Sequence, residues 1–243
     1  MKAHTSGPVG LNIQGTWQYW RPPLGTTVEV GMVRGVDVAL PTHYHEEDQL
    51  TFVLSGRRRF LIGKRTIEVF PGRSVRIPAR TPHRSLSEST EVLCINVYTS
   101  PHTSEIFGPA SDLICLFLAE AGIARSNLLL PFDGQPRTIE TSVPAPAAEG
   151  IYRSRGETVS QAAQRSGMSR EGFSRRFKRL AGIAPQQYRL LENLNDARRL
   201  LRSGLPIGAA AAEAGFSDQS HLGRCFRRFF GVTPRRYVAG PSD

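Results

Sequence analysis

The sequence contains little cysteine and no long apolar run. Its three cysteines, Cys94, Cys115 and Cys225, are odd in number and far apart. A disulfide framework or a zinc site of the CxxC type is therefore not indicated, and each cysteine is expected to be a small buried side chain, with redox sensing as the alternative. No apolar stretch approaches the roughly 18 residues of a membrane span, and no secretion signal is recognisable. These absences predict a cytoplasmic protein without a membrane partner.

The excess positive charge is confined to one half of the chain. The formal net charge is +10; residues 150–243 carry 17 Lys and Arg against 7 Asp and Glu, whereas residues 1–149 carry 14 of each. A basic part beside a neutral part indicates that an anionic polymer is bound by the basic part alone. The length of 243 residues accommodates two ordinary domains.

The basic half contains an internal repeat. One copy begins at Gly167 and the other at Gly215, an offset of 48 residues. Later matching positions are offset by 49: Phe177, Gly182, Pro185 and Tyr188 recur as Phe226, Gly231, Pro234 and Tyr237. Two equivalent units usually bind two equivalent things.

Each copy predicts a helix-turn-helix, because a short helix and a glycine turn precede a capped, basic second helix. In the first copy, residues 158–166 form the short helix and Ser169 caps the next one. In the second copy, residues 207–214 form the short helix and Ser217 is the expected cap. The buried stripes expected on the second helices are Phe173, Phe177 and Leu180 in one copy and Leu222, Phe226 and Phe229 in the other.

A single longer helix is expected to join the two units. Pro185 opens it, and it runs to about Ser203, with Gly204 and Pro206 ending it. The residues expected on its inner face are Leu190, Leu194, Ala197 and Leu201. Such a helix fixes the separation of the two units, and a separation of about 34 Å, one DNA turn, places both in successive major grooves.

Residues 215–237 carry a recognisable motif, Gly-Phe-Ser-Asp-Gln-Ser-His-Leu-Gly-Arg-Cys-Phe-Arg-Arg-Phe-Phe-Gly-Val-Thr-Pro-Arg-Arg-Tyr. It resembles the signature of the AraC/XylS family of bacterial transcription regulators, and the likeness covers about residues 157–238. The resemblance implies a double helix-turn-helix that binds double-stranded DNA and an N-terminal domain for effector binding and dimerisation. It also implies contact with RNA polymerase at a promoter, so a homodimer and RNA polymerase are expected partners.

By motif position, the resemblance also implies which side chains contact DNA. The expected base readers are Glu171, Ser174 and Arg175 in the first unit and Gln219, Ser220, His221 and Arg224 in the second. Arginine suits guanine and glutamine suits adenine, whereas Glu171 would have to accept from cytosine. The side chains expected at phosphates are Arg170, Lys178, Arg227 and Arg228.

The neutral half shows the pattern of a small β-barrel. Short apolar runs between residues 28 and 99 are interrupted by glycine and proline, which indicates an antiparallel barrel or sandwich. His43, His45 and Gln49 share parity and point to one interior if their strand is continuous. With His83, they resemble the motifs of the cupin fold. Two positions depart from that pattern: Arg80 stands at a usual glycine and Ser87 at a frequent asparagine.

The role of the barrel residues has three alternatives. His43, His45, Gln49 and His83 suit a divalent metal such as zinc, iron, manganese or nickel. They equally suit a metal-free pocket for a small organic effector, or a purely structural cluster. Nearby, the run Arg57–Arg59 is expected to be solvated charge on an edge strand.

The predicted fold class is α+β with two domains. Residues 1–135 form a cupin-like barrel for effector binding and dimerisation, residues 136–150 a linker rich in proline and alanine, and residues 151–243 an all-helical double helix-turn-helix. Further helices are expected at residues 111–121, as a packing or dimer face, and around residues 147–155. The predicted function is transcription regulation without catalysis; the alternatives are a metalloenzyme or metal sensor tethered to DNA, and an architectural DNA-binding protein.

Overall fold

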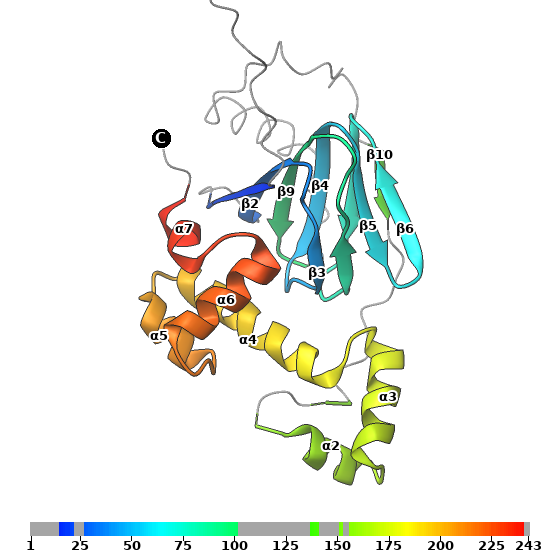
Figure 1. The fold of residues 1–243 in the computed structure, drawn as a ribbon, viewed down its shortest axis with the longest axis vertical. Helices are drawn as coiled ribbons and strands as arrows, with labels where there is room; N and C mark the ends of the chain where they lie inside the picture. The colour runs from blue at the N-terminus through cyan, green and yellow to red at the C-terminus, as the bar shows by residue number, and fades with distance from the viewer. Residues whose placement is uncertain (1–14, 22–26, 102–136, 141–150, 153–155, 241–243) are drawn as a thin grey trace, which may run out of the picture.

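The computed structural model describes residues 15–21, 27–101, 137–140, 151–152 and 156–240 (Figure 1). The strands are β1 (Thr16–Trp20), β2 (Thr27–Gly35), β3 (Leu40–His43), β4 (Asp48–Ser55), β5 (Arg58–Ile62), β6 (Arg65–Val69), β7 (Arg73–Ile77), β8 (His83–Ser85), β9 (Val92–Thr99) and β10 (Arg137–Glu140). The helices are α2 (Val159–Arg165), α3 (Arg170–Ala181), α4 (Pro185–Arg202), α5 (Ile207–Glu213), α6 (Gln219–Phe230) and α7 (Pro234–Ala239). The helices expected at residues 111–121 and around 147–155 lie outside or largely outside these ranges.

The strands form two sheets that face each other, as the cupin-like pattern predicts (Figure 1). One sheet has the order β1-β2-β9-β4-β7-β10 and the other β3-β8-β5-β6. Along β5 the burial alternates, with Arg58, Phe60 and Ile62 buried and their neighbours partly exposed. This period of two places one face of the strand inside the barrel. The fold class is confirmed: a β-barrel half precedes an all-helical half.

One segment assigned to the linker belongs to the sheet. Residues Arg137–Glu140 form β10, which pairs in parallel with β7 in the register Arg137 to Arg73. The β-branched pair Thr138 and Ile139 favours an extended strand, but four residues are too few to stand out beside a spacer rich in proline and alanine. The first residues of the range expected to be a linker, 136–150, thus include a strand of the sheet.

Arg58 corrects the expectation that the arginine run is solvated. Its side chain is 1% exposed and donates to the backbone oxygens of Leu86 at 3.1 Å and Val38 at 3.0 Å. The alternation of β5 turns this one arginine inward, where carbonyl groups replace its hydration. Its neighbours Arg57 and Arg59 remain partly exposed and pair with Glu88.

Both helix-turn-helix units are present, with two corrections at the level of single residues. Ser169 caps α3 as expected, whereas α6 is capped by Asp218, whose Oδ1 accepts from the backbone N–H of His221 at 2.7 Å. Ser217 supports that cap by donating to Asp218 at 3.0 Å. Leu180 is 46% exposed, and Ala181 is buried in its place.

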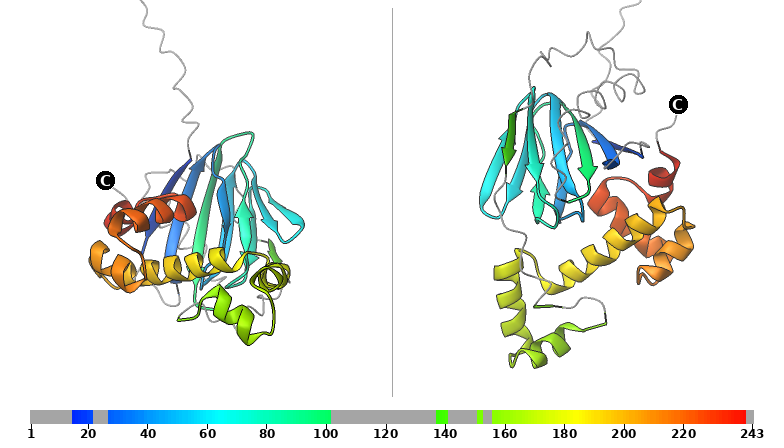
Figure 2. Two further views of the ribbon diagram at one scale, coloured as in Figure 1. Left: turned by 60° about the horizontal axis from the view of Figure 1, so that its bottom comes forward. Right: turned by 180° about the vertical axis from the view of Figure 1, so that it is seen from behind.

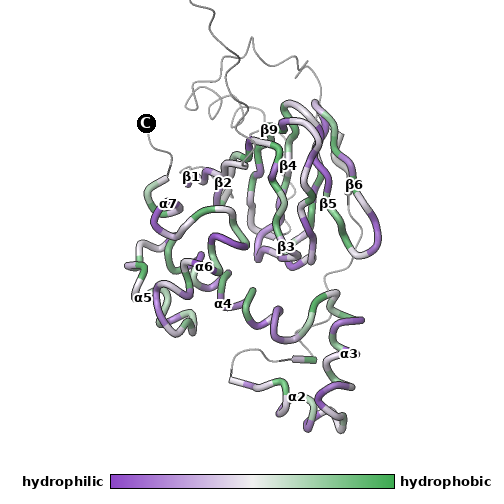
Figure 3. Tube along the Cα trace, in the orientation of Figure 1, coloured by the Kyte–Doolittle hydropathy of each residue, from purple (hydrophilic) through white to green (hydrophobic). Residues whose placement is uncertain are grey.

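The long helix α4 spans 18 residues from Pro185, about 27 Å at 1.5 Å per residue. It crosses the barrel from the first unit to the second (Figure 1, Figure 2). Leu194, Ala197 and Leu201 are buried as expected, and Leu190 is partly exposed. Hydrophilic and hydrophobic residues alternate along the tube of α4 in Figure 3, because one face of the helix is apolar and another is polar.

The cysteines and the lack of long apolar runs are consistent with this fold. Cys94 is buried in β9, and burial raises the pKa of its thiol to about 11, which keeps it uncharged. Cys225 is partly exposed on α6, and Cys115 lies outside the described residues. None of the helices that the structure describes combines the length and apolar character needed to cross a membrane.

The two repeats differ in how closely they approach the barrel, and a pair of matched substitutions tests this difference. Gly182 and Gly231 end α3 and α6 with φ angles of 75° and 77°, so alanine carries a similar backbone cost of about 1–2 kcal/mol at either position. A Cβ at Gly231 would lie 2.3 Å from the Trp17 ring, whereas a Cβ at Gly182 meets only Pro82 at 3.9 Å.

Gly231→Ala is therefore expected to lower the free energy of unfolding by at least about 1 kcal/mol more than Gly182→Ala, because overpacking adds to the backbone cost. Urea unfolding followed by circular dichroism measures both. Equal losses in the two variants would contradict the close contact between α6 and the barrel.

Candidate functional site

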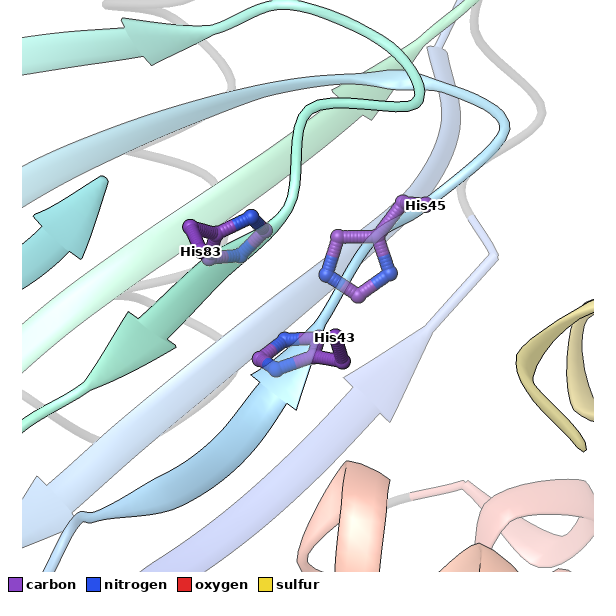
Figure 4. Close-up of side chains that lie close together, drawn as sticks. All are labelled: His43, His45 and His83. Carbon is purple, nitrogen blue, oxygen red and sulfur yellow. The ribbon is translucent and has the colours of Figure 1, made fainter. Parts of the chain in front are cut away.

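Three histidines meet inside the barrel (Figure 4). His43 ends β3, His83 begins β8, and His45 lies in the segment between β3 and β4. One potential ligand atom from each lies within 4.8 Å of the others, and all three side chains are buried. His43, His45 and Gln49 do not share one continuous strand, because the chain leaves the four-stranded sheet after His43 and enters the six-stranded sheet at Asp48.

The ring nitrogens of these histidines have different partners. The Nδ1 atoms of His43 and His83 lie 2.7 Å and 2.9 Å from the backbone oxygens of Pro41 and Thr81. A carbonyl oxygen only accepts, so both Nδ1 atoms carry the proton and both Nε2 atoms present a lone pair. His45 is the reverse: its Nδ1 lies 2.9 Å from Nη1 of Arg198, which only donates, so its proton is on Nε2.

Burial keeps all three imidazoles neutral. It lowers the pKa of His43 and His45 well below the ordinary value, with neighbouring positive groups adding to the effect. It lowers the pKa of His83 to about 4. The neutral imidazole is the form that binds metal ions.

The cavity beside the histidines is very small. Its volume is about 10 Å³, which is about the room that one water molecule needs. Gln49 also lines it, with its amide nitrogen donating to Thr51 at 2.9 Å and its Oε1 left without a partner among the described residues. In this conformation this cavity, as the described residues line it, has room for an ion or a water molecule.

The residues present fit a metal ion in part. The buried Nε2 atoms of His45 and His83 and the Oε1 of Gln49 lack hydrogen-bond partners among the described atoms, as ligand atoms would without their ion. Tetrahedral coordination with metal–nitrogen distances of about 2.0–2.1 Å requires ligand nitrogens about 3.4 Å apart. The ligand atoms of the three histidines lie within 4.8 Å of one another, so the three rings would have to move closer together to bind a metal ion. Only His45 has its proton on the wrong nitrogen.

The helical half closes this cavity. Phe229 and Phe230, at the end of α6, are part of its lining. The Tyr19 hydroxyl of β1 donates to the backbone oxygen of Phe230 at 2.9 Å, and the Phe230 ring stacks 6.2 Å from that of His45. The sequence predicted Phe229 as buried but gave no signal for Phe230, whose ring lies between the barrel residue His45 and the helical residues Phe226 and Arg198.

Arg198 of α4 is the centre of the contact between the two halves. It is 1% exposed and forms an ion pair with Glu29 of β2, whose side chain is fully buried. The Tyr237 hydroxyl of α7 donates to the same carboxylate. Burial alone would lower the pKa of Arg198, but the Glu29 carboxylate and nearby tyrosine oxygens outweigh it and raise that pKa.

Arg80 forms a second contact between the halves. Its φ of 59° is in the left-handed region, and it is the one non-glycine residue in the described ranges with positive φ. This conformation explains why the cupin pattern has glycine there. The guanidinium donates to the Tyr188 hydroxyl at 2.7 Å and to Glu192 at 2.9 Å, both on α4.

The remaining contacts of α4 lie along the same face. Gln187 donates to the backbone oxygen of Thr42 at 2.7 Å, and Asn195 donates to that of Tyr44 at 3.2 Å. The ion pair between Arg202 and Glu47 measures 2.5 Å. The polar residues of this face are Tyr188, Glu192, Asn195, Arg198 and Arg202. Their helical spacing is visible in the sequence, but a polar stripe is usually read as a solvated face.

The side chains expected to contact DNA lie on α3 and α6. Those that the structure leaves exposed are Arg170, Glu171, Arg175, Lys178, Gln219, Ser220, Arg224 and Arg228, while Ser174 and His221 are partly exposed. Glu171 lies in the first turn of α3, where the helix dipole favours an acid. Arg227 and Arg228 differ from the others because they also line a cleft of about 510 Å³ between α6 and the barrel. Both side chains are exposed, and the phosphate contact expected for them stays a prediction.

Comparison with known proteins agrees with this two-part arrangement. Residues 34–98 match the family described as a cupin domain, and residues 162–240 match the family described as a helix-turn-helix domain. The probable transcriptional regulator LumQ of Photobacterium leiognathi is 25% identical over 236 residues, covering 84% of this chain and 94% of LumQ. The regulator ArgR of Pseudomonas aeruginosa is 39% identical over 82 residues, covering 32% of this chain and 24% of ArgR.

The two family matches occur in the expected order and together span more than half of the 243 residues, and the relatives are transcriptional regulators. The chain therefore combines an N-terminal cupin domain with a C-terminal AraC-type helix-turn-helix domain, and its relatives are AraC-family transcriptional regulators. A crystal structure of ToxT from Vibrio cholerae strain SCE256, with an unsaturated fatty acid bound, shares the two-domain fold of this chain. The TM-score is 0.53 at 12% identity, covering 96% of this chain and 98% of ToxT.

The contacts of Arg80 give the first test of this site. Arg80→Ala retains the left-handed strain and loses the contacts to α4, whereas Arg80→Gly loses the contacts and relieves the strain. We expect Arg80→Gly to be more stable than Arg80→Ala by about 1 kcal/mol in urea unfolding. Hydrogen exchange along α4 should rise equally in both variants, and equal stabilities would contradict the backbone strain at residue 80.

The buried histidines predict a loss of stability in mild acid. His83 has a folded pKa of about 4 and an unfolded pKa of about 6.5, so its contribution is complete above pH 6.5 and is lost as the pH falls toward 4. The loss for this one residue amounts to about 3 kcal/mol. The midpoint of urea unfolding, measured in EDTA between pH 7.5 and 4, tests this loss of stability. The midpoint of His83→Gln should fall less steeply with decreasing pH than that of the unaltered chain.

Proposed function

We propose that this protein is a one-component transcription regulator in which α3 and α6 bind double-stranded DNA and an effector in the barrel controls the position of the helical half. The observation that carries this proposal is that both halves of the protein line the cavity. Phe229 and Phe230 come from the helical half, and His45, which accepts a hydrogen bond from Arg198, comes from the barrel. The effector site and the DNA-binding half are therefore one packed unit.

A cavity of about 10 Å³ links effector binding to movement of the helices. Any ligand larger than an ion must displace side chains from the cavity wall, and part of that wall is the end of α6. A ligand that binds only the opened barrel shifts the protein toward the undocked state. The relay thus runs through direct contact between the cavity wall and α6, and it does not require the linker.

The DNA-reading part of the proposal rests on the exposed faces of α3 and α6. Arg175 and Arg224 suit guanine, Gln219 suits adenine, and Arg170 and Lys178 suit phosphates. The outward faces of the repeats differ in sequence, so one protomer would read two unlike half-sites. A palindromic operator would then require a second copy of the chain.

The remaining parts of the proposal concern domains and partners. The barrel domain would extend through Glu140, a spacer would follow, and the helical domain would begin near residue 151. We expect dimerisation through the barrel half and contact with RNA polymerase at the promoter, as the family resemblance implies. Mapping the binding sites on genomic DNA identifies the operator, and neighbouring genes then indicate the effector.

A metalloenzyme or metal sensor is the second candidate function, favoured by the buried cluster His43, His45 and His83. Among the described residues, no carboxylate lines the adjoining cavity to serve as a general acid or base. Metal analysis of the purified protein, followed by His45→Ala, separates the candidates. Full operator binding and regulation by the metal-free variant would exclude both versions.

The roles assigned to Arg224 and Lys178 can be separated by their effects on different DNA sequences. Arg224→Ala should weaken operator binding by about 1–3 kcal/mol and relax the preference at one base pair. Lys178→Ala should weaken all sequences alike and lower the slope of log K against log salt by about 1.

Fluorescence anisotropy with the mapped operator, its single-base variants and random duplex at several salt concentrations measures both effects. Glu213→Gln, an exposed change on α5, is the control. Equal losses on specific and random DNA in both variants would overturn the assignment.

A further inference from the structure

We propose that a divalent transition-metal ion and Arg198 compete for His45, so that metal binding in the barrel releases α4. This inference rests on the proposed function, since it names one class of effector and the contact that the effector breaks. It is carried by the hydrogen bond between Nη1 of Arg198 and Nδ1 of His45, 2.9 Å long and fully buried.

Two of the three histidines are already arranged as ligands. The Nδ1–H groups of His43 and His83 donate to the backbone oxygens of Pro41 and Thr81, which fixes both rings and presents both Nε2 lone pairs. Donation from the non-ligating nitrogen to a carbonyl oxygen is the usual support of a metal-binding histidine. A metal ion therefore needs only a third ligand from this group.

His45 cannot supply that ligand while Arg198 is docked. Its Nδ1 lone pair is engaged by the guanidinium, and its Nε2 carries the proton. Coordination through Nε2 moves that proton to Nδ1, with no net gain or loss of protons. The new Nδ1–H would then face the N–H groups of Arg198, which have no acceptor to offer.

Coordination through Nδ1 meets the same obstacle, because it takes the lone pair that Arg198 uses. In either case the metal adds positive charge beside a buried guanidinium, where the low dielectric strengthens repulsion. Both routes require Arg198 to leave, so metal binding and docking of α4 exclude each other at this histidine.

The barrel can release Arg198 without leaving Glu29 isolated. The Tyr237 hydroxyl already donates to this carboxylate, and Nη1 of Arg202 lies 3.8 Å from it. That Nη1 atom is buried and has no hydrogen-bond partner in the described residues. Arg202 is thus placed to take over part of the charge of Glu29 when Arg198 moves.

Metal affinity is the first measurement. EDTA-treated full-length protein is titrated with Zn²⁺ against a chromophoric chelator and with Co²⁺ by its visible absorption. Arg198→Met should raise the affinity for both ions at least about tenfold, which corresponds to about 1.4 kcal/mol. The matched control Arg202→Met removes a contact of the same helix face that does not touch a histidine, and it should not raise the affinity, because it also removes the side chain that compensates Glu29 when Arg198 moves.

Three outcomes would overturn the competition. They are no change in affinity in Arg198→Met, an equal rise in Arg198→Met and Arg202→Met, and no metal binding by any variant. Because Arg198→Met alone leaves Glu29 facing an apolar side chain, the double variant Glu29→Gln with Arg198→Met removes both charges of the pair. If the single variant does not fold, the same affinity rise is required of the double variant.

Release of the helical half is the second measurement. Trp17 packs against Gly231 at the end of α6, and the chain has one other tryptophan, Trp20. In a Trp20→Phe background, saturating Zn²⁺ should shift the Trp17 emission to longer wavelength as the ring becomes solvated. Metal binding without this shift, and without faster hydrogen exchange in α4, would overturn the release step.

Failure of this inference is distinguishable from failure of the proposed function. If no metal binds but the protein recognises its operator and responds to an organic ligand, the proposed function stands and only the metal competition falls. If metal binds and releases α4 but no specific DNA site is found, the assignment as a transcription regulator falls.

Discussion

The arrangement of the two halves depends on one buried ion pair, Arg198 with Glu29. Both side chains are removed from water, which costs more free energy than a surface pair, and the partners that compensate each of them come from the opposite half: Glu29 and His45 for Arg198, and Arg198 and Tyr237 for Glu29. Removing one partner of such a pair costs about 3–5 kcal/mol, because the other charge remains buried. The pair therefore holds α4 in one register on the barrel, and the contacts of Arg80, Gln187, Asn195 and Arg202 follow from that register.

The same constraint makes the two repeats unequal. The second unit packs on the barrel, where Gly231 accommodates the Trp17 ring and Phe230 closes the cavity. In the first unit the matching residue, Gly182, is farther from the barrel, since a Cβ there would lie 3.9 Å from Pro82. An effector that opens the barrel would thus act first on α6 and, through the rigid α4, on the distance between the two reading helices. Control by the barrel needs no separate relay, because the sensing cavity and the second unit share side chains.

Local signals in the sequence predicted the elements well. The helices followed from caps, glycine turns and the 3.6-residue period, and the barrel from short runs with period two. The errors lie where tertiary packing decides between neighbours: Leu180 is exposed while Ala181 is buried, and Arg58 faces inward from a charged run. Arg80 shows the same limit. The sequence shows that an arginine replaces the glycine usual in the cupin pattern, but only the packed structure shows why: the residue has a strained, left-handed backbone and its side chain contacts α4.

The sequence by itself determined the two halves, the double helix-turn-helix, the family resemblance and the four barrel residues His43, His45, Gln49 and His83. These follow from local periodicity, composition and motif spacing, which are properties of neighbouring residues. Only the tertiary structure decided that Arg198, more than 150 residues away, occupies the Nδ1 atom of His45. A hydrogen bond between distant segments leaves no local pattern, because the polar face of α4 looks like any solvated helix face until the barrel covers it.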